Sequence, residues 1–589
     1  MPSLDRSDRV LVPVVNTDGL RQFLNFSHGT LADFSEVVLL GVILSSGDAG
    51  QDAHRARNFR RRLRQSIREV ATGNSRIVVR SAQTISQAVR ASILDEQPDL
   101  VLLPWTSAQD GLDELATRPF CNTAFVRPAG GGQTSRVLLA ARGGPQAELA
   151  MEIALRLAKT ARAELTVMHI DRPSADNEAR DRERRLFRSL VARCRRRIPA
   201  KQRTLTGDDI AEAIVKEASH HDVLVLGAGL ARGAEPALGA LADGIAHQAG
   251  CTTIVVKTGT PVDPAFFAGA NTPIDVIVDR WFADNTFHCR EFGDLDSLIA
   301  AKQRSGMTIS LAVMARENRQ ALPGIIDTVT AELVDRNRFL DEIVVFDQEG
   351  SVLQPPFDLV KRPAGNGAIP VLPADGLALW KSVNHLQGEI IAWVDGDLRN
   401  IHSRMVYGVV GPLLTQSRLH YVKGFYQQPA GADDASFSQG RTQLTELTAR
   451  PLLNLFFPEL SGVVAPLTRE HAIRRSAIEG LRLFAGPGVE IGLLIDVFQR
   501  FGLRAIAQSD LESRVGEDLS VAVLSEQAFS VAQVILQRLG KGDPSRFEVE
   551  RQTMKLILQE DERYRLQVVQ TADRQLPKLS TSGRSHAID

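Results

Sequence analysis

The sequence is poor in cysteine, aromatic residues and long apolar runs, and neither sign of charge is in excess. Its four cysteines lie far apart with no C-x-x-C pair, which indicates neither a disulfide framework nor a structural zinc site. The 69 basic and 70 acidic residues argue against a general nucleic-acid or anionic-membrane binder. No apolar stretch approaches the ~20 residues of a membrane-spanning helix. We therefore expect a cytoplasmic protein with no nucleic-acid partner and no membrane span.

An internal repeat occupies the first part of the chain. At ~150 residues per domain, 589 residues predict three to four domains. Three short segments recur after 123 to 130 residues: they begin at Arg9, Asp99 and Cys121, and again at Arg136, Asp222 and Cys251. This near-constant separation indicates two tandem copies of one unit.

Each copy has the pattern of an α/β unit. Continuous Val, Leu and Ile runs alternate with segments of helical period, such as Ile85 to Leu94 and Ile210 to Ala218. Because strands buried on both faces read as continuous apolar runs, each copy is predicted to be a parallel sheet covered by helices.

This order of elements resembles the universal stress protein family, here as a tandem pair. In that family a glycine-rich loop after the fourth strand holds ATP phosphates on backbone N–H groups. The second copy keeps part of the loop in Gly229 and Gly239, whereas Ala240 replaces a hydroxyl residue and Arg142 stands where an acid is expected. The resemblance implies ATP binding at the two glycines; alternatively, they only permit turns. The first copy lacks the glycine spacing.

Composition suggests the domain limits. The stretch after Thr258 is rich in Pro, Gly and Thr, and the repeat does not continue beyond it. The expected organisation is residues 1–131 and 132–260 for the two copies, 261–275 for a linker, 276–570 for a third domain and 571–589 for a flexible tail.

The third domain is predicted to hold a second open α/β sheet. Buried strands are expected at 307–314, 342–347 and 389–395, with a helix at 325–333. Asp395-Gly396-Asp397 follows the third of these strands. Two carboxylates around a small residue can aim at one hard cation, and such a cation can bridge the diphosphate of a nucleotide sugar.

From about Trp281 to Ser525 the chain resembles the glucosyl-3-phosphoglycerate synthases, retaining glycosyltransferases of the GT-A fold. The matching stretches begin at Ala378, Val394, Val410, Val422, Leu444, Gly486 and Leu503. The resemblance implies transfer of a hexose from UDP-glucose or a GDP-sugar to 3-phosphoglycerate, or a related small anionic acceptor, with Mg²⁺ or Mn²⁺. It also suggests a homodimer.

The resemblance also implies roles for single residues. Asp397 and Glu490 would be catalytic, and Asp397 and Asp518 would bind the metal. The predicted donor-binding residues are Ala315, Asp347, Asp395 and Gly396. Arg441 and Thr445 would bind the acceptor, since a guanidinium can donate two parallel hydrogen bonds to an anion, and Lys423 would lie in the supporting shell.

Two departures from the family pattern bear on activity. Asp375 stands where a lysine is expected beside the donor diphosphate, which reverses a charge next to phosphates. The late histidine that completes the metal site in the family is absent from residues 513–518, where Glu517 or Asp518 could offer an oxygen instead.

Two functions follow as hypotheses. The first is a divergent, metal-dependent hexosyltransferase that makes a compatible solute or its phosphorylated precursor. The alternative is a catalytically degenerate transferase domain with a regulatory role, fused to nucleotide-sensing stress-protein domains. The retained acceptor-side stretches favour the first hypothesis, and the altered donor-side residues favour the second.

Overall fold

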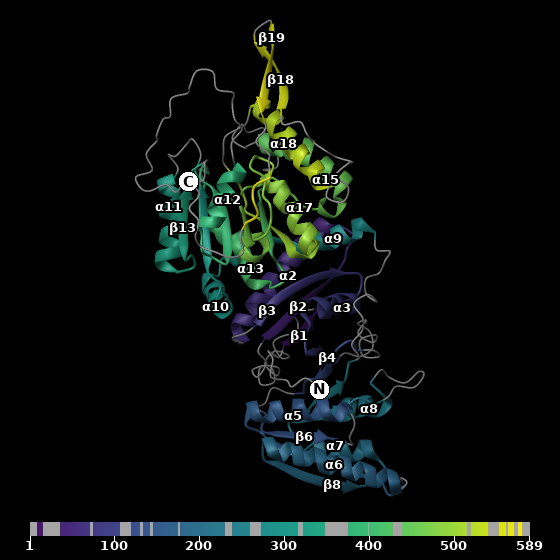
Figure 1. The fold of residues 1–589 in the computed structure, drawn as a ribbon. Helices are drawn as coiled ribbons and strands as arrows, with labels where there is room; N and C mark the ends of the chain where they lie inside the picture. The colour runs from purple at the N-terminus through teal and green to yellow at the C-terminus, as the bar shows by residue number, and fades with distance from the viewer. Residues whose placement is uncertain are drawn as a thin grey trace. The chain divides into compact units, whose positions relative to one another are not determined.

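Two large β-sheets and one two-stranded sheet organise the described residues in the computed structural model (Figure 1). The chain forms two compact units, unit 1, Met1–Asn271, and unit 2, Thr272–Asp589. The structure describes residues 9–15, 36–70, 75–105, 119–129, 134–141, 145–174, 177–229, 238–259, 273–315, 322–347, 375–398, 400–427, 439–514, 520–539, 553–560, 563–570 and 575–579.

Unit 1 is built on one ten-stranded sheet with the order β3-β2-β1-β4-β5-β10-β9-β6-β7-β8. The strands are β1 (Arg9–Val14), β2 (Glu36–Leu44), β3 (Ser75–Ala82), β4 (Leu100–Pro104), β5 (Thr123–Arg127), β6 (Arg136–Ala140), β7 (Glu164–Asp171), β8 (Ala200–Thr206), β9 (Val223–Gly227) and β10 (Thr252–Lys257). Each half is parallel throughout, and the halves join through the antiparallel pair β5–β10.

The two halves of this sheet repeat one strand order, and one set of contacts recurs in both. The Asp99 carboxylate accepts a hydrogen bond from the Arg9 amide at 2.9 Å, and Asp222 accepts one from the Arg136 amide at 2.8 Å. The Asp99 and Asp222 amides in turn donate to the Arg9 and Arg136 carbonyls. The predicted parallel sheet in each copy is therefore confirmed.

Helices cover both faces of the unit 1 sheet. They are α2 (Ala49–Val70), α3 (Ile85–Glu96), α5 (Pro145–Ala161), α6 (Asn177–Arg197), α7 (Ile210–Ala218) and α8 (Ala240–Gln248). Side chains of α2, α5 and α6 share one core with alternate strand residues such as Val10 and Val12. Side chains of α3, α7 and α8 share the opposite core with Leu11.

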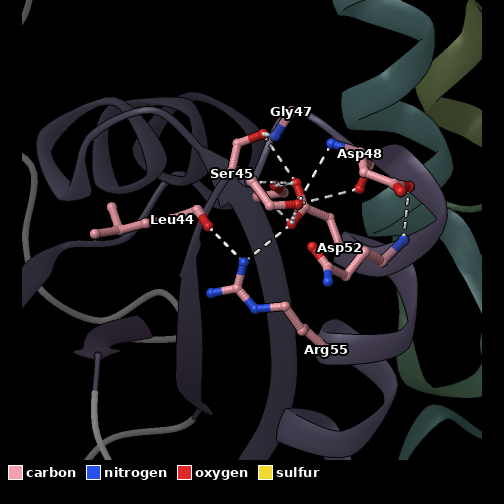
Figure 2. A network of polar contacts seen from close by, with 9 residues as sticks. Leu44, Ser45, Gly47, Asp48, Asp52 and Arg55 are labelled. Carbon is pink, nitrogen blue, oxygen red and sulfur yellow. Dashed lines mark hydrogen bonds and ion pairs between the residues drawn. The ribbon is translucent and has the colours of Figure 1, made fainter.

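A buried carboxylate fixes the turn between β2 and α2 (Figure 2). Asp52, only 2% exposed, accepts hydrogen bonds from the hydroxyls of Ser45 and Ser46 at 2.9 Å each. Arg55 donates both to Asp52 and to the Leu44 carbonyl, which ends the strand. The first turn of α2 thus binds the polar groups that β2 leaves at its carboxyl end.

Unit 2 has a seven-stranded sheet with the order β11-β17-β15-β16-β14-β12-β13. Its strands are β11 (Thr286–His288), β12 (Ile309–Met314), β13 (Glu342–Phe346), β14 (Ile390–Asp395), β15 (Tyr421–Phe425), β16 (His471–Arg474) and β17 (Ile506–Asp510). All neighbouring pairs are parallel except those of β16, which runs antiparallel between β15 and β14. The carboxyl ends of β12, β13, β14, β15 and β17 therefore share one edge with the amino end of β16.

Helices pack on both faces of this sheet as well. The α-helices are α9 (Ile274–Asn285), α10 (Leu295–Ser305), α11 (Leu322–Thr330), α12 (Asp375–His385), α13 (Ser403–Thr415), α14 (Gln439–Leu444), α15 (Arg450–Phe456), α16 (Arg475–Ile478), α17 (Val489–Phe501) and α18 (Val521–Leu539). Single π-helical turns at Ala331–Arg336 and Thr445–Ala449 follow α11 and α14. Among the described helices, none combines the length and apolar character that crossing a bilayer requires.

The structure corrects the predicted ends of the third domain. The expected flexible tail from residue 571 is wrong over Gln575–Leu579, because Leu576 and Leu579 are buried and Trp380 donates a hydrogen bond to the Pro577 carbonyl. The hairpin of β18 (Thr553–Glu560) and β19 (Arg563–Gln570) was not foreseen as an element; Figure 1 shows it beside α18. The strands predicted at 307–314, 342–347 and 389–395 are confirmed as β12, β13 and β14.

Candidate functional site

The predicted donor-binding residues meet at the carboxyl edge of the unit 2 sheet. In the register of the parallel strands, Met314 pairs with both Phe346 and Asp395. The residues that follow, Ala315 and Gly396, are tied to the neighbouring strand ends: the Ala315 amide donates to the Phe346 carbonyl at 2.8 Å, and the Gly396 amide to the Met314 carbonyl at 2.9 Å. Ligands of open α/β sheets bind at this edge.

Position 396 has room for no side chain. A Cβ atom there would lie 2.9 Å from the Met314 carbonyl oxygen and 3.2 Å from the Ala315 Cα. Both contacts are with backbone of the adjacent strand end, which cannot move away cheaply. Gly396 therefore lets the backbone between the two aspartates pass close to β12, whereas the approach of a ligand to this backbone stays a prediction.

Asp395 organises the site. Its carboxylate is 2% exposed and accepts hydrogen bonds from Arg514 Nη2 at 3.0 Å and Arg469 Nη1 at 3.4 Å. It also accepts one from the Asp397 amide at 3.3 Å. Two guanidinium groups thus balance the buried charge of Asp395, and Asp395 in turn fixes the backbone that carries Asp397.

The antiparallel strand β16 delivers the first of these arginines. Trp393 on β14 pairs with His471 on β16, so the residues just before His471 lie opposite the end of β14. Glu470, fully buried, accepts the Asp395 amide hydrogen bond at 3.3 Å. Arg469 is the next residue outward, and it joins Asp395 to Asp375 at the start of α12, with Nη2 2.6 Å from the Asp375 carboxylate.

Arg514 approaches the site from the loop after β17. Burial alone would lower the pKa of its guanidinium, but the charges of Glu470 and Asp395 act in the opposite direction and leave that pKa raised. Arg514 therefore stays a cation. Glu470 and Asp395, acidic groups from two neighbouring strands, hold it in place.

A pocket of about 420 Å³, part of it open solvent, lies at this edge. Its lining residues are Met314, Ala315, Asp347, Asp375, Ala378, Leu379, Trp393, Arg469, His471 and Glu490. It brings together Ala315 and Asp347 of the predicted donor site and the predicted catalytic Glu490. Glu490 stands in the first turn of α17, where the positive end of the helix dipole stabilises its negative charge.

A neutral histidine forms the apolar wall of the pocket. His471 is 1% exposed, and its ring lies 4.9 Å from that of Trp393 and 5.6 Å from that of Tyr421. Burial, and secondarily the charge of Lys423, hold the pKa of His471 well below its ordinary value. Lys423 is itself buried and donates to the Thr468 carbonyl, so it supports the segment that carries Arg469.

Other predicted residues lie elsewhere or outside the described part. Thr445 begins a π-helical turn and is 6% exposed, but it does not line this pocket. Arg441 belongs to α14, whose backbone is described. Asp518 lies outside the described residues.

The chemistry of the described carboxylates fits a hard divalent cation. Asp395 is engaged by two guanidinium groups, whereas Asp397 follows it at the rim of the strand, where its half-buried carboxylate can offer oxygen. Mg²⁺ is commonly held by one or two carboxylates together with substrate phosphates. Asp397 is therefore the residue of the pair suited to a metal.

Sequence reasoning did not single out the two arginines. Arg514 belongs to the segment 513–518, in which the family pattern has a histidine, and no motif in the sequence points to Arg469. One signal was present: an Arg-Glu pair directly before a buried strand puts two charges at a sheet edge. Only the antiparallel pairing of β16 with β14, however, shows that Arg469 and Glu470 lie beside Asp395.

In unit 1 the two glycines of the predicted nucleotide loop lie against each other. Gly229 follows β9, and its amide donates to the Leu238 carbonyl at 2.8 Å. Gly239 precedes α8 with φ of +82°, and a Cβ atom on it would lie 2.9 Å from the Gly229 Cα. The two glycines are therefore in contact, and Gly239 is the residue directly before the N-terminus of α8.

Comparisons with known proteins divide the chain in the same way. The model of the Universal stress protein family matches residues 134–257. The glucosyl-3-phosphoglycerate synthase of Petrotoga mobilis is 38% identical over 267 residues, which are 44% of this chain and 81% of that protein. That of Mycolicibacterium paratuberculosis is 36% identical over 274 residues, 45% of this chain and 82% of that protein.

Solved structures with similar sequences belong to the same group of enzymes. One is glucosyl-3-phosphoglycerate synthase from Mycobacterium tuberculosis in complex with Mn²⁺ and UDP-glucose, with 32% identity over 48% of this chain and 94% of that chain and a TM-score of 0.39. Another is mannosyl-3-phosphoglycerate synthase from Rubrobacter xylanophilus, with 26% identity over 51% of this chain and 96% of that chain and a TM-score of 0.42.

Proposed function

The chain belongs to the glucosyl-3-phosphoglycerate synthase family, and from this premise we propose that unit 2 transfers glucose from UDP-glucose to 3-phosphoglycerate. The products are glucosyl-3-phosphoglycerate and UDP, with retention at the anomeric carbon. The observation that carries the proposal is the convergence of Asp395, Gly396 and Asp397 with Arg469 at the carboxyl edge of a mainly parallel sheet. Residues 276–570 are the proposed GT-A domain.

The donor binds along the strand ends in this proposal. Ala315 and Asp347 line the pocket from the ends of β12 and β13 and are proposed to face the nucleoside, and Gly396 is proposed to contact the donor through its backbone. Asp395 keeps Arg469, Arg514 and the Asp397 amide in fixed positions. Such preorganisation avoids a reorganisation cost when charge develops on the leaving diphosphate.

Asp397 is the proposed protein ligand for Mg²⁺ or Mn²⁺, and Asp518 is proposed as a second. When bound, the cation would neutralise the diphosphate as it leaves. The neighbouring aspartate contributes by its hydrogen bond to the Asp397 amide, which orients the chain at that point.

Glu490 is proposed to lie beside the anomeric carbon. It reaches the pocket from the first turn of α17, and its carboxylate can stabilise the positive charge that develops on the sugar. Arg441 and Thr445 are proposed to bind the phosphate and carboxylate of the acceptor, because both belong to the segment that forms α14 and the π-helical turn.

For unit 1 we propose two universal stress protein domains. The family match covers the second half, and the same strand order and the same Arg–Asp contacts in the first half support the second assignment. We also propose that ATP binds at Gly229 and Gly239, since their loop leads into the N-terminus of α8. A homodimer and a cytoplasmic location stay predictions from the sequence.

A catalytically degenerate regulator is not favoured. Its main support was the loss of a lysine at position 375, but Arg469 places a cation at that point of the pocket. A thermal-shift screen tests the transferase proposal directly. UDP-glucose with Mg²⁺ should raise the Tm of the full chain, and UDP-glucose without the cation should raise it less. No shift with any nucleotide sugar would contradict the proposal.

A further inference from the structure

The pocket has an excess of negative charge, although its proposed ligand is an anion. Among the described residues that line it, Asp347, Asp375 and Glu490 carry carboxylates, and Arg469 carries a fixed positive charge. His471 is neutral, because burial holds its pKa well below the ordinary value. A diphosphate entering this pocket would therefore meet its attractive partner at Arg469.

The geometry of Arg469 leaves it able to bind such a ligand. Its guanidinium has five N–H donors. Among the described residues its acceptors are Asp375, 2.6 Å from Nη2, and Asp395, 3.4 Å from Nη1. These two bonds use two of the five donors, and the residue lines the pocket. The two carboxylates hold the guanidinium plane from two sides, so little side-chain entropy is lost when a ligand binds.

The position of Asp375 explains how a charge reversal can be tolerated. Asp375 is the first residue of α12, where an acidic side chain is favourable at the helix N-terminus. It is largely buried, with 14% of its side chain exposed, and it lies within hydrogen-bond distance of Arg469. The pair is neutral overall, and its guanidinium belongs to Arg469, two residues before the start of β16.

We propose that Arg469 is the residue that binds the donor diphosphate, in place of the lysine that the family pattern puts at position 375. Asp375 acts as a positioning residue that holds the guanidinium toward the pocket. This inference rests on the proposed function, because it assumes a nucleoside diphosphate sugar as donor. It departs from the sequence expectation, in which Asp375 weakens donor binding.

If the Arg469–Asp375 pair had only a structural role, different effects of the two substitutions on nucleotide binding would be expected. If Arg469 and Asp375 served only to join β16 to α12, removing either partner would leave the other charge buried and unpaired. Both substitutions would then weaken nucleotide binding together, as a result of lost stability. If Arg469 binds the diphosphate, the two substitutions act in opposite directions, because Asp375 repels phosphate and Arg469 attracts it.

The test is calorimetric titration of the full chain with UDP and with uridine, both with Mg²⁺. Arg469→Gln should weaken UDP binding at least tenfold and leave uridine binding unchanged within about twofold. Arg469→Lys should retain part of the UDP affinity, because it keeps the charge and loses the planar fork. Asp375→Asn keeps a side-chain oxygen that can accept the Arg469 hydrogen bond and removes only the negative charge, so UDP binding should equal that of the wild type or be tighter.

Arg290→Gln provides the matched control. Arg290 is also an ion-paired arginine of unit 2, with Glu512 as partner, but it does not line the pocket. This variant should bind UDP like the wild type. The Tm of every variant is measured alongside, and if Arg469→Gln does not fold, Arg469→Lys and Asp375→Asn decide the question.

The outcomes separate this inference from the proposed function. Two results would overturn the role of Arg469. In the first, Arg469→Gln binds UDP as tightly as the wild type. In the second, Asp375→Asn weakens UDP binding as much as the Arg469 variants do. A wild-type chain that binds no UDP with Mg²⁺ instead contradicts the proposed donor, and with it the function.

Discussion

Arg469 donates a hydrogen bond to Asp375 at 2.6 Å, across the pocket edge between β16 and α12. The pair changes how the altered donor-side residues are interpreted. An aspartate in place of a lysine reverses the charge beside a diphosphate, yet here the aspartate is neutralised by a guanidinium that also contacts Asp395. The site keeps a cation at this point and obtains it from the segment before β16 instead of from the start of α12.

Glu490→Gln tests the proposed catalytic carboxylate on α17. The substitution keeps the size of the side chain and removes the charge that would stabilise the developing cation on the sugar. We expect kcat to fall by about 10²- to 10⁴-fold, with the KM for UDP-glucose changed only a few-fold. Glu479→Gln, on a half-buried glutamate outside the pocket, should change neither. An unaltered kcat in Glu490→Gln would remove Glu490 from the reaction centre.

Arg441→Lys tests the acceptor side. Lysine keeps the charge but cannot donate two parallel hydrogen bonds to a phosphate or carboxylate. The KM for 3-phosphoglycerate should rise about tenfold while the KM for UDP-glucose stays constant. Arg450→Lys is the control, because Arg450 is bonded to Glu446 and to the carbonyls of Val463 and Val464 and does not line the pocket. Equal effects of the two substitutions would contradict an acceptor role for Arg441.

Gly239→Val tests the loop of unit 1. The residue has φ of +82° and lies against Gly229, so a branched side chain is strained and also meets backbone. We expect a loss of stability of about 1–3 kcal/mol and a loss of ATP binding by calorimetry. Gly244→Ala is the matched control, because Gly244 lies in α8 with open space around its Cα. ATP binding that survives Gly239→Val would place any nucleotide elsewhere.

The Asp52 network predicts how unit 1 responds to acid. Burial raises the pKa of Asp52, but hydrogen bonds from Ser45, Ser46 and Ser81 outweigh burial and leave that pKa lowered. A lowered folded-state pKa stabilises the protein above the unfolded-state value of about 4, and this contribution is lost as pH falls through the folded-state pKa.

Asp52→Asn should therefore reduce stability at pH 7 by about 1–3 kcal/mol and flatten the fall in Tm below about pH 4. Thermal denaturation of unit 1 across pH 3 to 7 measures both effects. Asp181→Asn, on the exposed side of α6, serves as control. An Asp52→Asn variant with the wild-type pH profile would show that the network does not hold the turn.

Much of the fold could be predicted from the sequence, because strands buried on both faces leave continuous apolar runs. The first residues of the repeated segments, such as Arg9 and Arg136, begin equivalent strands. The antiparallel joint between β5 and β10 could not be predicted, since nothing local in either strand specifies its partner. Leu576 and Leu579 were missed because two apolar residues in a polar tail show no period.

The candidate site, like the fold, could be predicted from the sequence only in part. Asp395, Gly396 and Asp397 are adjacent in sequence and follow a buried strand, so their shared location could be predicted. The Arg469–Asp395 contact joins residues 74 positions apart through an antiparallel pairing within a mainly parallel sheet. Charge compensation of this kind is visible only in three dimensions.

Release of UDP from UDP-glucose by the full chain with Mg²⁺ tests the central proposal most directly. We predict release that depends on 3-phosphoglycerate, stops when the cation is chelated and falls at least about 100-fold in Asp397→Ala. A folded wild-type protein that releases no UDP with this acceptor, or an Asp397→Ala variant as active as the wild type, would contradict it.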